Sequence, residues 1–176
     1  MNGFSAESHS NAPPRPSLWG TKSAVREPLL ELRHLVVRYG VVGAVHGISL
    51  TVNSGEVVAL LGANGAGKSS TLNAIVGLAP RSGGRVFFEG RDITLMSTEA
   101  IIKSGLALVP EGRRLFRNMT VNENLRLGAA KLRRSDFEQL LPEIFELFPM
   151  IGNRLHSQAG FLSGGEQQQV AIARAL

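Results

Sequence analysis

The sequence predicts an α/β fold, because a buried strand, a glycine-rich loop and a helix follow one another within Glu56–Val76. The run Glu56–Leu61 is rich in valine and leucine and lacks period-2 alternation, which is typical of a strand covered on both faces of a parallel sheet. The pattern G-x-x-x-x-G-K-S/T follows, with its fixed positions at Gly62, Gly67, Lys68 and Ser69. The apolar stripe of a helix then continues at Leu72, Ile75 and Val76.

The glycine-rich loop has the chemistry of a phosphate-binding loop. Its glycines let backbone N–H groups turn toward an anion, and the helix behind it contributes the positive end of its dipole. A turn that only caps a helix would have no use for adjacent Lys68 and Ser69. We therefore predict binding of ATP with Mg²⁺, where Lys68 reaches the β and γ phosphates and Ser69 holds the metal. The expected nucleotide contacts in the loop are Gly62, Asn64, Gly65, Gly67, Lys68, Ser69 and Ser70.

The composition is that of one globular domain. Its 176 residues are 43% hydrophobic and 19% charged, which suffices for a sizeable core. No apolar run approaches the roughly 20 residues that span a bilayer, and a chain without cysteine has neither disulfides nor thiolate metal sites. The net charge of +5 would suit nucleic acid, but the basic residues are scattered and form no nucleic-acid motif. We expect no nucleic-acid partner.

The segments on either side of the loop predict further strands. Residues 1–28 are rich in proline, serine and asparagine, so we expect a disordered tail there. The segments that begin near Leu29 and at Gly47 read as two antiparallel strands. Beyond the loop helix, Arg81–Gly84 reads as a loop and RVFFEG as an edge strand. The apolar run LALVP, at residues 106–110, predicts another buried parallel strand.

Helical signals dominate the second half of the chain. A short helix is predicted at Ser97–Ser104 with Ser97 as its N-cap. From Thr120 onward the apolar period is helical, which predicts a helical subdomain at about residues 118–165, with Pro142 starting or kinking its second helix. Its Phe and Met residues are interpreted as the subdomain's own core, with a docking surface as the alternative.

A second motif, LSGGE, occupies residues 162–166. Ser163 and Glu166 have the spacing of a capping box, which would satisfy two backbone N–H groups at a helix start. That interpretation leaves Gly164 and Gly165 unexplained, because each glycine in a first turn costs up to about 1 kcal/mol relative to alanine. Bare glycines at a helix N-terminus instead let a phosphate approach the backbone, so we predict a second phosphate site, with the simple cap as the alternative.

Together these motifs resemble the nucleotide-binding subunits of ABC transporters, and the resemblance covers Leu29–Leu176 without a gap. The resemblance implies a P-loop NTPase fold with an antiparallel β edge, a parallel core sheet and a helical subdomain. It also implies that two subunits pair head to tail, so that one subunit's signature closes over ATP held by the other. The signature residues implied to act in trans are Ser163, Gly164, Gly165 and Glu166.

Two further positions match the family pattern. Tyr39 resembles the family's aromatic residue that stacks on adenine, although a tyrosine with a structural role is the alternative. Glu111 stands where most members have a glutamine that helps to bind Mg²⁺ and the attacking water. The run around it, LVPEGRRLFRNMTVNENLRLGA, is similar to ATPase subunits of branched-chain amino acid importers, as is the loop segment, in which Ser70 replaces the commoner threonine.

The resemblance implies an ATP-hydrolysing subunit that energises an importer of branched-chain amino acids. The alternatives are an importer ATPase for urea or short amides, a non-transport ABC protein, and a catalytically incompetent ATP-binding fragment. The implied partners are a second ATPase subunit, transmembrane permease subunits and, indirectly, a periplasmic binding protein. The implied location of the chain is the cytoplasmic face of the inner membrane, where it is held through the permease subunits. In the family, the Mg²⁺-binding aspartate, the catalytic glutamate and the switch histidine follow the signature helix. We therefore expect a chain that ends at Leu176 to be incomplete and inactive alone.

Overall fold

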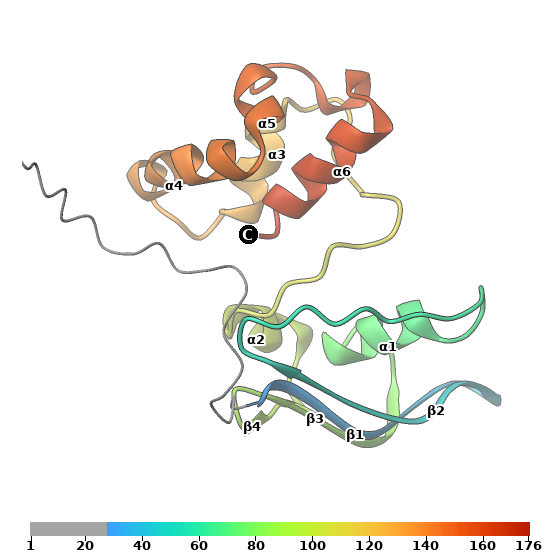
Figure 1. Cartoon of the computed structure of the whole chain (residues 1–176). Coiled ribbons are helices and arrows are strands. Elements are labelled where there is room, and N and C mark those ends of the chain that lie inside the picture. Colours follow the sequence, from blue (N-terminus) through green and yellow to red (C-terminus); the bar gives the residue numbers. More distant parts are fainter. Residues whose placement is uncertain (1–27) are drawn as a thin grey trace, which may run out of the picture.

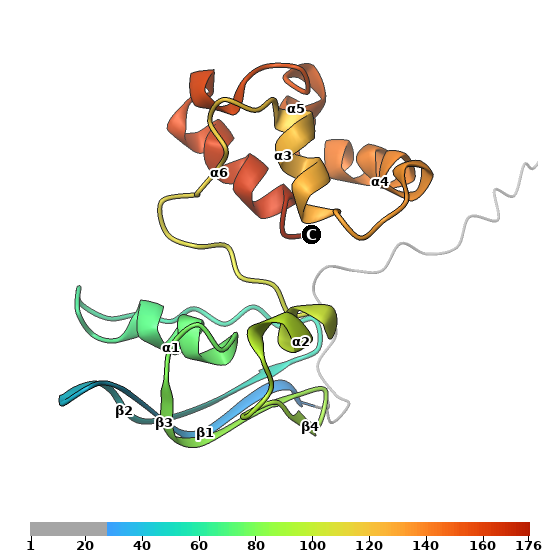
Figure 2. The ribbon, with the colours of Figure 1, turned by 180° about the vertical axis from the view of Figure 1, so that it is seen from behind.

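The computed structural model describes residues 28–176, and the predicted tail lies outside them except for Pro28. The elements form two groups, a sheet with two helices and a set of four helices, joined by one extended connection (Figure 1). The view from behind shows the same separation (Figure 2). In the first group the elements are β1 Pro28–Tyr39, β2 Val42–Asn53, α1 Lys68–Ile75, β3 Arg81–Phe88, β4 Arg91–Asp92 and α2 Thr98–Lys103. In the second they are α3 Val121–Gly128, α4 Arg134–Leu147, α5 Pro149–Asn153, the 3₁₀ turn Ala159–Phe161 and α6 Gly164–Ala173.

The sheet is antiparallel, with strand order β2-β1-β3-β4. This confirms the predicted antiparallel pairing of the first two strands, in which Leu32 of β1 lies opposite Leu50 of β2. Side chains on one face of the sheet pack with α1 and α2 into the first hydrophobic core. Its buried members are Leu32, Leu35, Val37, Val45, Ala74, Ile75, Ala79, Val86, Phe88, Ile93 and Ile101.

The predicted loop at Arg81–Gly84 is wrong, because β3 begins at Arg81 and pairs with β1 through this segment. The pairing jumps from Arg33↔Arg85 to Val36↔Gly83, so β1 has a bulge opposite the glycines. Gly84 has φ +80°, and a Cβ there would overlap the backbone carbonyls of the bulge. The glycines therefore accommodate an irregular strand and do not end it.

The two predicted parallel strands are not formed within residues 28–176. The segments 56–61 and 106–110 are extended connections without strand partners, and Val57 and Leu61 are 93% and 89% exposed. An apolar run becomes a buried strand only when neighbouring strands satisfy its N–H and C=O groups. No described segment provides such neighbours, so the valine-rich pattern is present without the parallel sheet that it predicts.

Arg81 joins the C-terminal end of α1 to the edge of the sheet. Its guanidinium donates to the carbonyl of Ala74 at 2.6 Å and of Ile93 at 2.7 Å, and also to those of Ile75 and Thr94. Burial lowers the pKa of Arg81 from its ordinary value. A cation at the last carbonyls of a helix complements the helix dipole, so Arg81 fixes the far end of the helix that begins at the loop.

The predicted helix at Ser97–Ser104 is confirmed as α2, whose N-cap Ser97 accepts a hydrogen bond from the N–H of Ala100 at 3.3 Å.

Pro142 lies inside α4, and neither starts nor ends the helix. No helix among residues 28–176 is both long and apolar enough to cross a bilayer.

The four helices surround a second hydrophobic core. Phe137 is buried in it, and the partly buried Phe145, Phe148 and Met150 pack against it. The interpretation as core holds for these side chains but not for Phe161, which is 85% exposed. Helix α6 extends beyond the predicted boundary at residue 165 and packs into the same core through Val170 and Ala173. The remaining buried members are Val121, Leu125, Ile151 and Leu162.

Asn124 of α3 is a fully buried polar residue that pins the connection to the helical group. Its Oδ1 accepts from the N–H of Phe116 at 2.9 Å, and its Nδ2 donates to the carbonyls of Phe116 at 3.0 Å and Thr120 at 2.9 Å. One side chain thus satisfies both backbone groups of Phe116, which fixes the chain just before α3.

We predict that Asn124→Ala lowers the free energy of unfolding by about 2–3 kcal/mol, because buried backbone groups lose their partner. Urea denaturation followed by circular dichroism measures the change. Asn153→Ala, at an exposed position in α5, serves as the matched control and should have little effect. Equal losses in the two variants would contradict the role of Asn124.

Candidate functional site

Helix α1 begins at the loop without a side-chain cap. Its N-cap is Gly67, with φ +87°, and Gly65 before it has φ +84°, a region that favours glycine. The N–H and the side-chain hydroxyl of Thr71 both donate to the carbonyl of Gly67, at 2.8 Å and 2.9 Å. Among residues 28–176 the N–H groups of Lys68, Ser69 and Ser70 have no hydrogen-bond acceptor, so they are free to bind an anion.

Gly67 lies against β2, and this contact positions the loop on the sheet. A Cβ at Gly67 would overlap the backbone carbonyl oxygen of Ala44 and lie 3.2 Å from a methyl group of Val45. Only glycine permits both this approach and the positive φ. The start of the helix is therefore fixed against the beginning of β2.

A cavity of about 340 Å³ brings together most of the predicted nucleotide contacts. Glu111, which is 42 residues away in the sequence, joins the loop here, because Ser69 Oγ donates to Glu111 Oε1 at 2.6 Å. Ala44 of β2 completes one wall. The predicted residues that line the cavity are Asn64, Gly65, Gly67, Lys68, Ser69, Ser70 and Glu111.

The polar groups of this cavity suit a phosphate and a hard cation. Lys68 Nζ donates to the carbonyls of Gly62 and Ala63, both at 2.7 Å, so the ammonium lies along the loop. Ser69 and Glu111 place a hydroxyl and a carboxylate oxygen together, and oxygen ligands are those that Mg²⁺ prefers. The cavity thus combines free N–H groups, an ammonium and two oxygen atoms that can be ligands of a metal ion.

The LSGGE segment forms the start of α6. Ser163 Oγ accepts from the N–H of Glu166 at 3.3 Å, and Glu166 Oε2 accepts from the N–H of Ser163 at 2.7 Å, so the capping box that was the alternative interpretation is present. The second phosphate site stays a prediction. A Cβ built at Gly165 would have no described atom within 4 Å apart from its chain neighbours and the backbone of its own helix. None of these residues lines the loop cavity, so the two predicted phosphate sites are separate within the chain.

Tyr39 is the last residue of β1, at the turn into β2. The turn between β1 and β2 lies at the same end of the sheet as the start of α1 (Figures 1 and 2). Tyr39 is 48% exposed and does not line the loop cavity. Its stacking on adenine therefore stays a prediction.

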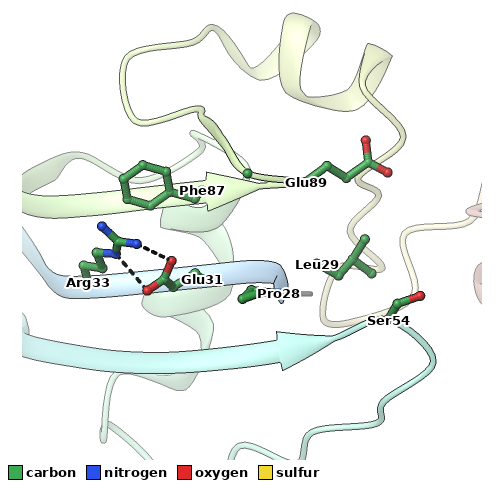
Figure 3. Close-up of a pocket in the computed structure, with 8 residues that line it drawn as sticks. Pro28, Leu29, Glu31, Arg33, Ser54, Phe87 and Glu89 are labelled. Carbon is green, nitrogen blue, oxygen red and sulfur yellow. Dashed lines mark hydrogen bonds and ion pairs between the residues drawn. The ribbon is translucent and has the colours of Figure 1, made fainter. Parts of the chain in front are cut away.

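A larger cavity of about 680 Å³ lies at the opposite end of the sheet, on a face formed by β1 and β3 (Figure 3). Arg33 donates to both carboxylate oxygens of Glu31, at 2.7 Å and 2.8 Å, and its guanidinium lies 4.4 Å from the ring centre of Phe87. The hydrogen bond from Arg33 lowers the pKa of Glu31. These groups satisfy one another, and no residue of the loop takes part.

Comparison with known proteins identifies the family. Residues 45–176 match the family described as ABC transporter, a range that includes the phosphate-loop residues, Glu111 and the LSGGE segment. The chain belongs to the ABC transporter family. The resemblance inferred from the motifs is confirmed, and so is the fold class at the level of the family.

Several curated ABC proteins are similar in sequence. The high-affinity branched-chain amino acid transport ATP-binding protein BraG of Pseudomonas aeruginosa is 41% identical over 138 residues, which cover 78% of this chain and 59% of BraG. The lipopolysaccharide export system ATP-binding protein LptB of Escherichia coli is 38% identical over 151 residues, covering 84% of this chain and 62% of LptB. The chain therefore spans about six tenths of the length of these relatives.

Solved structures agree with this fold. A nucleotide-free ATP-binding cassette from an ABC transporter superposes with a TM-score of 0.74 at 31% identity, covering 85% of this chain and 64% of the other. A second structure, of an ATP-binding subunit of an ABC transporter, gives a TM-score of 0.70 at 32% identity, covering 83% and 60%.

Sequence reasoning missed three residues that shape the site. Ala44 contributes a backbone carbonyl, which leaves no trace in side-chain chemistry. Gln167 of α6 and Arg174, which follows the last residue of α6, contact the segment after Glu111 through hydrogen bonds to Arg113 and Arg114. For Gln167 and Arg174 the sequence offers only their place after the LSGGE motif. That place does not reveal a contact with residues more than 50 positions earlier in the chain.

We predict that Gly67→Ala destabilises the protein more than Gly65→Ala. Both glycines have a similar positive φ, which costs a residue with a Cβ about 1–2 kcal/mol, but only Gly67 also meets a backbone oxygen. The additional overlap should cost about 1–3 kcal/mol in the free energy of unfolding. Chemical denaturation of the two variants measures the difference, and equal losses would contradict the close approach to Ala44.

The capping box of α6 predicts a pH dependence. The N–H and hydroxyl of Ser163 lower the pKa of Glu166, so its stabilisation is complete above its unfolded pKa of about 4.3 and is lost as the pH falls through the lower folded value. Glu166→Gln keeps a hydrogen-bond acceptor that does not titrate. Between pH 6 and pH 3 the urea midpoint should fall less in this variant than in the unsubstituted chain, whereas Glu143→Gln, at an exposed position, should behave like the unsubstituted chain.

Proposed function

We propose that this chain is part of the ATP-binding and ATP-hydrolysing subunit of an ABC importer for branched-chain amino acids. BraG, and a probable branched-chain amino acid transport ATP-binding protein LivF of Archaeoglobus fulgidus at 34% identity, support this substrate class through their names. LptB favours a second candidate, an exporter ATPase, because its match covers more of the chain at a slightly lower identity. Urea or short amides remain the alternative importer substrates.

The observation that carries the proposal is the hydrogen bond between Ser69 and Glu111 inside the loop cavity. In this proposal the free N–H groups of the loop and of α1 bind the phosphates of ATP. Lys68, which donates to two loop carbonyls, would turn to phosphate oxygens, and Ser69 and Glu111 would hold Mg²⁺. Bound Mg²⁺ would neutralise the negative charge that develops on the phosphate oxygens during hydrolysis.

The signature residues complete the site from a second subunit. Ser163, Gly164, Gly165 and Glu166 lie outside the loop cavity of their own chain, and Gly165 is open on its outer side, which suits an approach by a phosphate held elsewhere. Tyr39 stacks on the adenine of the nucleotide bound at the loop of its own chain. The other partners are transmembrane permease subunits and, indirectly, a periplasmic binding protein. The chain itself lies at the cytoplasmic face of the membrane.

The water-activating group is not assigned to any described residue. Glu166 is engaged in the capping box and Glu111 bonds to Ser69, so neither is free to act as a general base. We propose that residues 29–176 form the nucleotide-binding domain, that the helical subdomain predicted at about 118–165 continues through α6, and that this chain alone binds ATP without appreciable hydrolysis.

We predict that Lys68→Ala weakens binding of a fluorescent ATP analogue with Mg²⁺ by about 100-fold or more, since a charge-assisted contact to phosphate is lost. Lys131→Ala, at an exposed position in the helical group, is the control and should bind normally. Fluorescence titration measures both.

Ser163→Arg tests the arrangement in trans. It should leave nucleotide binding to a single chain within about twofold of the unsubstituted value, because the loop cavity is untouched. In a dimer that hydrolyses ATP it should block turnover. A loss of binding equal to that of Lys68→Ala would overturn the assignment in trans.

A further inference from the structure

The segment that follows Glu111 has an unusual backbone. Gly112, Arg113 and Arg114 have φ values of +73°, +63° and +45°, three successive residues in the left-handed region. Residues with a Cβ rarely adopt this conformation, so the surrounding structure must hold it in place.

Arg174, near the end of α6, supplies two of the contacts that hold this segment. Its Nη2 donates to the carbonyl of Arg113 at 3.2 Å, and its Nη1 donates to the carbonyl of Arg114 at 3.0 Å. A planar guanidinium can bridge two successive carbonyls in this way, whereas a lysine ammonium is a single point of charge. Contact between α6 and α3 is also close, since a Cβ at Gly128 would overlap the carbonyl of Arg174.

A second contact comes from the start of the same helix. Arg113 Nη1 lies 3.4 Å from Gln167 Oε1, and Gln167 Nε2 donates to the carbonyls of Ala159 and Leu162, at 3.3 Å and 3.0 Å. A Cβ at Gly164 would lie 3.2 Å from the Arg113 guanidinium. The segment after Glu111 is therefore held along the length of the signature helix.

We propose that Arg174 is a positioning residue for the nucleotide site: by holding the carbonyls of Arg113 and Arg114, it keeps Glu111 within hydrogen-bond distance of Ser69. This inference rests on the proposed function of the loop cavity. Arg174 itself does not line that cavity. By holding the backbone of residues 112–114, Arg174 fixes the position of the Glu111 carboxylate that precedes them.

The clamp is tested without nucleotide by amide hydrogen exchange in the whole chain. Within the segment the N–H groups of Arg114 and Phe116 donate hydrogen bonds. Arg174→Lys should raise the exchange rates of these two amides by about tenfold or more, because the two-carbonyl bridge is lost. Arg134→Lys, at an exposed position on α4, should leave them unchanged. Gln167→Ala provides a second variant that weakens the same segment from the other end of α6. Unchanged exchange in Arg174→Lys overturns the proposal.

The role in positioning is tested by titration with a fluorescent ATP analogue in the presence and absence of Mg²⁺. Arg174→Lys should reduce the enhancement of affinity by Mg²⁺ about fivefold or more and leave the Mg²⁺-free affinity within about twofold. In a Glu111→Ala background the same substitution should cause no further loss, because the two residues act through one contact. A merely structural role would weaken binding equally with and without Mg²⁺, and that outcome overturns the proposal.

The two proposals fail in distinguishable ways. Absence of analogue binding to the unsubstituted chain would refute the proposed function and, with it, the role of Arg174 at the nucleotide site. Normal binding together with unchanged exchange or an unchanged Mg²⁺ effect in Arg174→Lys would refute the positioning role alone.

Discussion

The contact between Gly67 and the carbonyl of Ala44 is the constraint on which the site depends. It places the first turn of α1 against β2, and from there the free N–H groups, Lys68 and Ser69 take their positions. Arg81 holds the other end of the same short helix through the last carbonyls of α1. An eight-residue helix would be marginal by itself, so its two anchored ends keep the loop in a defined place.

Two distant segments converge on this helix. Glu111 reaches Ser69 from the connection between the two groups of elements, and α6 holds the residues that follow Glu111. The signature of the family is thus linked, inside one chain, to the cavity that it does not line. In the proposed dimer the same helix would face a second nucleotide through Ser163 and Gly165, so each α6 would contact one site directly and influence the other through Arg174.

Local signals were readable from the sequence and contacts between distant segments were not. The loop pattern, the Ser97 cap and the Ser163–Glu166 box depend on residues three to seven positions apart, and the structure contains all three. Glycines 83 and 84 were misread because the bulge that they accommodate lies in another strand. The apolar run at 56–61 was misread because burial requires neighbours that the run does not specify. Ala44 and Arg174 act on or through backbone carbonyls, which carry no residue-specific signal.

Asn124 has a mechanical consequence. Because its side chain binds both backbone groups of Phe116, the chain from Phe116 onward is part of the helical group and would move with it as one body. Any rotation of that group against the sheet would therefore have its hinge in the short stretch between α2 and Phe116, which includes Glu111. A hinge at this point would turn a change in the spacing between the two bodies directly into a displacement of the carboxylate beside Ser69.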